Sequence, residues 1–143
     1  MNQSPKISKT NKSVFNKIAV YFMVALFAGV GVMHFIKTET FAHAMPNYLP
    51  EKILLVQITG VLEILGAVGL LISKTRRAAG ICIALFLVCV FPVNLNMALH
   101  PENFHAVPAW ILYLRLPIQG LLIWLAMVAS KYPGSCQKPE NKD

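Results

Sequence analysis

The sequence predicts an all-α fold, a transmembrane four-helix bundle, and three observations lead to it. Of the 143 residues, 56% are apolar and only 13% are charged, against roughly 25% charged residues in soluble domains. Four apolar runs use up most of the chain, and each is close to the roughly 20 residues that a helix needs to cross a bilayer. None of these runs shows the polar outer face, at a period of 3.6 residues, that a soluble helix would need.

The four helices are expected at about 18–36, 53–72, 78–99 and 109–130. The first follows a basic leader, and Ala42-His43-Ala44 has the small-x-small form of a signal-peptide cleavage site. A cut there would leave Lys37 and Glu39 between the apolar run and the cleavage point, which is unusual for a leader. We therefore interpret this segment as a retained helix. A soluble helical protein is the alternative that the lengths of the segments disfavour.

The later helices carry charges and prolines in unusual places. Glu63 is the only charged residue in the run 53–72 and would lie near the midplane of the bilayer, where ionisable groups usually mark a partner or a function. Arg115 is the corresponding charge in the last run. Pro92 and Pro117 interrupt helices three and four, and each leaves the carbonyl four residues earlier without its helical partner. Such a backbone group needs protein, water or a ligand to satisfy it, although simple kinking for packing is an alternative.

Lysine and arginine orient the bundle, because they accumulate in cytoplasmic loops. The opposite side has only Lys37 and Lys52, between helices one and two. Ten such residues fall on one side: Lys6, Lys9, Lys12, Lys17, Lys74, Arg76, Arg77, Lys131, Lys138 and Lys142. Both termini are therefore expected to be cytoplasmic, with residues 1–17 and 131–143 as mobile tails, in a bacterial cytoplasmic (inner) membrane. The net charge of +7 fits contact with anionic lipid head groups of the bilayer, and no nucleic-acid partner is expected.

Threading the helices in this order brings the polar residues together in the outer half of the bundle, while the inner half is nearly all apolar. Helical phase places Arg115 and Gln119 on the small-residue face of helix four, and Glu63 on a face with Gly60 and Ala67. An ion pair between Arg115 and Glu63 follows as a hypothesis. The candidate ligand-binding or buried polar cluster is His34, Gln57, Glu63, Asn94, Arg115, Gln119, Tyr48 and Tyr113.

Cysteine and histidine give little support for a redox or metal centre. Cys82 and Cys89 are seven residues apart on one helix, about 10 Å along its axis, too far for a disulfide. No Cys-x-x-Cys motif is present. Histidines in the outer loops, with His34 as a third ligand, permit a metal or haem, but no spacing demands one. No metal site and no bound cofactor are therefore predicted, and histidines near water at the interface are the preferred interpretation.

Six short stretches give the chain a resemblance to a known family, and together they span about residues 18–129. They are Gly31-Val32-Met33-His34-Phe35, Met45-Pro46-Asn47-Tyr48-Leu49-Pro50, Gly60-Val61-Leu62-Glu63, Thr75-Arg76-Arg77, Phe91-Pro92-Val93-Asn94 and Leu114-Arg115-Leu116-Pro117-Ile118-Gln119. In this order they resemble the DoxX-like family of small four-helix integral membrane proteins. The family takes its name from a subunit of a thiosulfate:quinone oxidoreductase, and other members look like accessory or assembly factors, some with soluble redox enzymes. The resemblance carries no established catalytic residue across.

Three functions are compatible with these features. The first, which we prefer, is an accessory or scaffold subunit that binds a partner or a small apolar ligand in the outer polar pocket and is not an enzyme on its own. The partner would be a protein such as a redox enzyme, or a second copy of the chain. The second is a component of a quinone-linked membrane oxidoreductase, in which Glu63 or His34 exchanges protons and Arg115 or Gln119 binds a quinone carbonyl. The third is a small transporter or ion pathway, for which four helices without a repeat leave little room.

Overall fold

The structure, a computed structural model, describes residues 6–43, 45, 49–104 and 108–131. Its elements are α1 (Lys6–Ile36), α2 (Thr38–His43), α3 (Lys52–Leu71), α4 (Arg76–Leu99), the 3₁₀ helix η1 (Pro101–Asn103) and α5 (Ala109–Ser130). The described residues form helices and no strand, which confirms the all-α prediction. Four segments are long and apolar enough to cross a membrane: Val14–Ile36, Lys52–Leu71, Arg76–Leu99 and Ala109–Ser130.

Three of the four predicted helices agree closely with the structure, and the first differs. Helix α1 begins at Lys6, so the basic segment expected as a mobile tail is helical from that residue onward. The sequence 6–28 contains no proline or glycine that would stop a helix running back from the apolar run. The short helix α2 lies where a loop was expected. Thr38 marks this junction, because its hydroxyl donates a hydrogen bond of 2.7 Å to the carbonyl of His34 near the end of α1.

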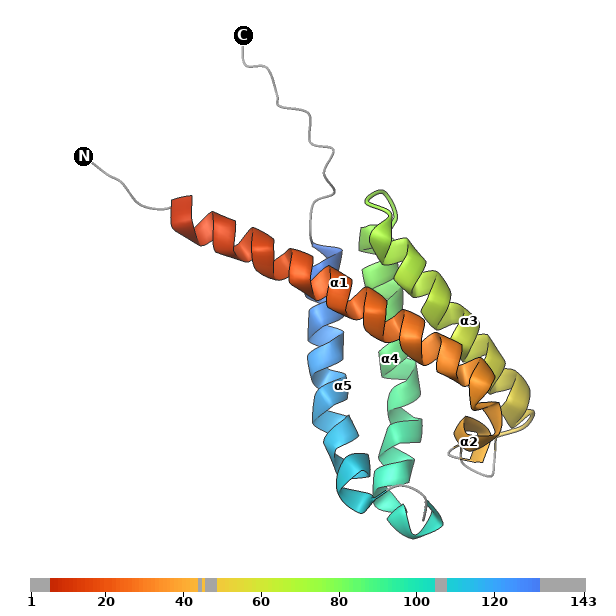
Figure 1. The fold of residues 1–143 in the computed structure, drawn as a ribbon. Coiled ribbons are helices and arrows are strands. Elements are labelled where there is room, and N and C mark those ends of the chain that lie inside the picture. The colour runs from red at the N-terminus through yellow and green to blue at the C-terminus, as the bar shows by residue number, and fades with distance from the viewer. Residues whose placement is uncertain (1–5, 44, 46–48, 105–107, 132–143) are drawn as a thin grey trace.

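The four long helices alternate in direction and pack in a ring (Figure 1). Helix α1 packs on α3 and α5, and α4 packs on the same two neighbours. The turn between α3 and α4 and the end of α5 lie at one end of the bundle, here named the turn end after residues 72–75, while the start of α1 projects sideways beyond α5 (Figure 1). Helices α2 and η1 lie at the other end, here named the cavity end (Figure 1). The structure thus shows an antiparallel bundle of four long helices.

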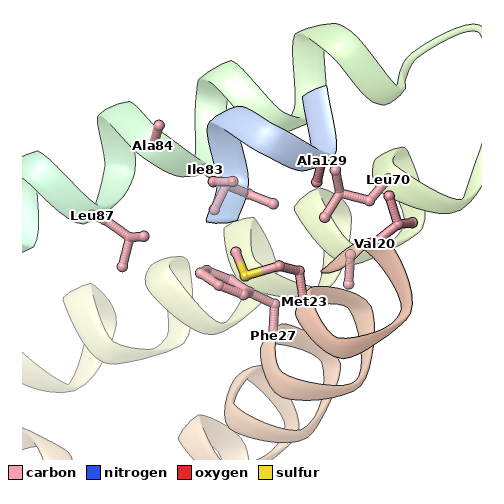
Figure 2. Packing of buried hydrophobic residues seen from close by; sticks show 10 residues of the cluster. Val20, Met23, Phe27, Leu70, Ile83, Ala84, Leu87 and Ala129 are labelled. Carbon is pink, nitrogen blue, oxygen red and sulfur yellow. The ribbon is translucent and has the colours of Figure 1, made fainter. Parts of the chain in front are cut away.

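The apolar core lies toward the turn end. Met23 and Phe27 of α1 pack there against Leu70 of α3 and Ile83 of α4, as Figure 2 shows. Met23 and Leu70 have no exposed surface at all. The remaining members of the core are Val20, Ala67, Ala84, Leu87, Ala126 and Ala129. Many large apolar side chains instead face outward, such as Leu65 and Leu85, each 60% exposed, and this is the surface that a lipid environment favours.

Small residues and two side-chain caps hold the turn end together. A Cβ atom on Gly80 would lie 2.6 Å from the Cβ of Ser130, so α4 and α5 are in backbone contact there. At the turn itself, Thr75 Oγ1 donates to the carbonyl of Gly69 at 2.9 Å, and Arg76 Nε donates to the carbonyl of Leu70 at 2.7 Å. Both bonds satisfy carbonyls of the last turn of α3, which have no partner within the helix.

Candidate functional site

A cavity of about 610 Å³ lies among the helices toward the cavity end. This volume falls within the roughly 300–1,000 Å³ typical of small-molecule sites. Side chains from α1, α2, α3, α4 and α5 line it, and most of them are apolar, including Leu26, Val30, Phe86, Val90 and Leu122. The polar lining residues are His34, Thr59, Glu63, Asn94, Arg115 and Gln119. The cavity therefore combines a large apolar wall with a few polar groups, which is the usual composition of a ligand site.

Two glycines bring the first polar pair into contact. A Cβ atom on Gly31 would lie 2.9 Å from the carbonyl oxygen of Gly60, and one on Gly60 would lie 2.8 Å from the Cβ of His34. Helices α1 and α3 therefore cross here in backbone contact. His34 and Glu63 each follow one of these glycines by three residues, so they lie on the same helix faces as the glycines. The crossing thus determines which polar side chains meet.

His34 and Glu63 form a buried contact at this crossing. Glu63 Oε2 lies 3.2 Å from His34 Nδ1, and the two side chains are 10% and 11% exposed respectively. His34 Nδ1 lies still closer, at 2.9 Å, to the carbonyl of Val30, to which its N–H donates. The carboxylate of Glu63 therefore contacts the imidazole, but its Oε2 atom accepts no hydrogen bond from a described residue. Phe41 of α2 stacks on the imidazole, with ring centroids 4.2 Å apart and planes inclined by 15°.

The predicted ion pair between Arg115 and Glu63 is not formed, and this correction has a topological cause. Among the described residues, Glu63 forms its ion pair with His34, and Arg115 Nη1 instead lies 3.5 Å from the sulfur of Met97. Helix α3, which carries Glu63, is diagonal to α5 in the ring, whereas α1 is adjacent to α3. Depth along the bundle could be estimated from the sequence, but the order of the helices around the ring could not.

Asn94 and Gln119 form a second polar pair, between α4 and α5. Asn94 Nδ2 donates to Gln119 Oε1 at 3.0 Å, and Gln119 Nε2 donates to the carbonyl of Leu87. Gln119 is only 3% exposed. Helix α4 stays continuous through Pro92, and the Leu87 carbonyl lies next to that of Val88, which the proline deprives of its helical partner. Gln119 therefore supports the backbone beside the proline and fixes the orientation of Asn94 toward the cavity.

The structure brings five of the eight predicted site residues to the cavity: His34, Glu63, Asn94, Arg115 and Gln119. Gln57 and Tyr113 are exposed and do not line it, and Tyr48 lies outside the described residues. Phe41 and Met97 also belong to the site, because they contact His34 and Arg115 respectively, and neither was predicted from the sequence. An aromatic ring in an expected loop and a methionine in an apolar run give no signal of a site in a single sequence.

Cysteines and metal-ligating groups are dispersed in the described part of the chain. No group of three or more His, Cys, Asp and Glu residues there is arranged to hold a metal ion. Cys82 and Cys89 are both exposed free thiols, and Cys89 also lines the cavity. His100 contacts Glu102 at 3.2 Å at the surface of the cavity end.

Over the described residues, fold and site together define a small helical protein with four helices able to cross a membrane and a partly open cavity lined by apolar and polar side chains. The chain belongs to the family described as a domain of unknown function, DUF8561, which matches residues 23–130. The matched segment contains every residue that lines the cavity. No curated protein and no solved structure matches the chain.

Proposed function

We propose that this chain is an accessory or scaffold subunit of a bacterial cytoplasmic membrane, and that its cavity binds a small, largely apolar molecule through a polar head. The observation that carries the proposal is the cavity of about 610 Å³. Side chains from four membrane-length helices line it, yet its polar groups come mainly from residues near the cavity end, such as Asn94 and Arg115. A packed bundle without a ligand would fill this space with apolar side chains, as it does at the turn end.

The charge distribution supports an orientation with both termini in the cytoplasm. Lys74 and Arg77 lie at the turn end with the end of α5, and the basic start of α1 projects sideways beyond α5 (Figure 1). Most basic residues of the described segments thus lie outside the cavity end, which is the asymmetry that the positive-inside rule associates with a cytoplasmic face on the opposite side. In this orientation the cavity end faces the outer leaflet.

The resemblance to DoxX-like proteins supports an accessory role for the chain. Four of the six resembling stretches each contribute a polar residue to the cavity, among them His34, Glu63 and Asn94. In the proposed role, the cavity serves a complex with a redox enzyme, and the chain itself supplies a binding site and not a reaction.

A pair of valines on α4 tests whether the cavity holds the ligand. Val90 lines the cavity, whereas Val88, two residues earlier, is 55% exposed and faces outward. Tryptophan at position 90 fills the space, while tryptophan at position 88 adds bulk to the outer surface. Native mass spectrometry of the mildly solubilised protein is expected to show a bound small molecule in the wild type and in Val88→Trp, and an empty protein in Val90→Trp. An empty wild type, or equal occupancy in both variants, contradicts the proposal.

A further inference from the structure

The guanidinium of Arg115 is the charged group of the cavity that lacks a counter-ion. Its Nη1 contacts the sulfur of Met97, which is a weak acceptor. No carboxylate of the described residues forms an ion pair with it, since Glu63 pairs with His34 and Glu102 with His100. A charged group at membrane depth is costly unless it is paired or hydrated, so the geometry leaves a place for an anion beside Arg115.

The acid of the cavity contacts His34 and forms no ion pair with Arg115. Glu63, the acid that lines the cavity, has its Oε2 atom 3.2 Å from Nδ1 of His34. This Oε2 atom is buried at the contact with His34. Arg115 is therefore the cationic side chain of the cavity that no carboxylate of the described residues contacts within ion-pair distance.

The position of Arg115 along the bundle indicates how a ligand would lie. Arg115 is six residues into α5, about 9 Å from the start of that helix, and so lies near the cavity end. The apolar lining continues from there toward the turn end through Phe86, Leu122 and Leu26. A hydrocarbon tail attached to a head group beside Arg115 would thus lie against these apolar side chains.

We propose that the cavity binds an amphiphile with an anionic oxygen head and a hydrocarbon tail, whose head lies on Arg115 and whose tail lies along Phe86, Leu122 and Leu26. This inference rests on the proposed function and names the class of ligand for the same cavity. A carboxylate or a phosphate both match a guanidinium, because each can accept two parallel hydrogen bonds from it. The head could belong to a free fatty acid or to a membrane phospholipid, which carry the same recognised chemistry.

A matched pair of probes separates the contribution of head-group charge to the binding affinity from that of the hydrocarbon tail. Palmitate and hexadecanol have the same chain length and differ in the head, so their dissociation constants are compared on the delipidated full-length protein in non-ionic detergent. Wild type is expected to bind palmitate about tenfold to a hundredfold more tightly than hexadecanol, the range for a hydrogen bond to a charged group. Arg115→Gln removes that preference while hexadecanol still binds, which also shows that the variant is folded. Arg115→Lys keeps the positive charge and retains most of the preference.

The control is Arg77→Gln, which removes an exposed guanidinium at the turn end and is expected to leave both affinities unchanged. Displacement of palmitate by phosphatidylglycerol supports a phospholipid as the source of the head, and its failure to displace supports a free fatty acid. Equal affinity for palmitate and hexadecanol, or tighter binding of a neutral ubiquinone analogue, overturns the anionic head but leaves the cavity as a binding site. Binding of every probe that survives Val90→Trp overturns the proposed function itself.

Discussion

At the turn end α3, α4 and α5 meet through small residues, whereas at the cavity end the close approach is between α1 and α3. Gly80 lies against Ser130, and Gly69 against Ala79, so the turn end has backbones in contact. At the cavity end Gly31 and Gly60 close one helix pair, while α4 and α5 are joined by the side chains of Asn94 and Gln119. The space between these two pairs is the cavity.

This difference between the two ends shows how a short bundle can be stable and still contain a cavity. Interhelical contact in a membrane depends on close packing of backbones, because lipid tails are as apolar as leucine. Small residues supply that contact at the turn end, where the apolar core also lies. The cavity end can then carry larger and polar side chains that do not fill the interior.

The largest effect is expected from breaking the turn end. Leucine in place of Gly80 would drive its Cβ to 2.6 Å from the Cβ of Ser130 and 2.8 Å from the carbonyl oxygen of Ala126. Because one of these contacts is backbone, α4 and α5 must separate, and Gly80→Leu is expected to lower the free energy of unfolding by about 3 kcal/mol. Denaturation of the purified protein by SDS measures this loss.

Gly120→Leu is the matched control for that change, since no atom lies within 4 Å of a Cβ added to Gly120. It replaces a glycine in the interior of α5 and is expected to keep or slightly raise stability. Equal losses for the two variants would show that the turn end is not held together by backbone contact.

An intermediate effect is expected from the polar pair at the α1–α3 crossing. In double-mutant cycles, His34→Ala with Glu63→Gln is expected to show a coupling energy of about 1 kcal/mol, as for other buried polar contacts between membrane helices. The cycle of Glu63→Gln with Arg115→Gln is expected to show coupling near zero, since the structure forms no contact between them. The free energies of unfolding of the wild type, the single variants and the double variants, all measured in the same detergent, give both coupling energies. A larger coupling energy in the second cycle than in the first would contradict this arrangement and favour the ion pair between Arg115 and Glu63 predicted from the sequence.

The sequence was sufficient for the helices and for the end of the bundle at which the polar groups gather, but not for their pairing. Composition and segment length predicted the long helices, because the bilayer sets the length of an apolar helix. Helical phase correctly placed Glu63 on a buried face with Gly60 and Ala67, and Gln119 on the buried face of the last helix. The partner of Glu63 depended on helix α1 crossing at Gly31, and a single sequence does not encode which helices are neighbours in the ring.

The smallest effects are expected at the predicted site residues that the structure leaves outside the cavity. Gln57 lies on the exposed face of α3, so Gln57→Leu is expected to change the free energy of unfolding by less than about 0.5 kcal/mol and to leave ligand occupancy unchanged. The same substitution at Gln119 removes the hydrogen bonds to Asn94 and to the carbonyl of Leu87, at a cost of about 1–3 kcal/mol for the groups left unpaired. Tyr113→Phe, on the outward face of α5, should behave like Gln57→Leu. Thermal unfolding and native mass spectrometry of these three variants provide the comparison. Loss of ligand in Gln57→Leu or Tyr113→Phe would move the binding site from the cavity to the outer surface of the bundle.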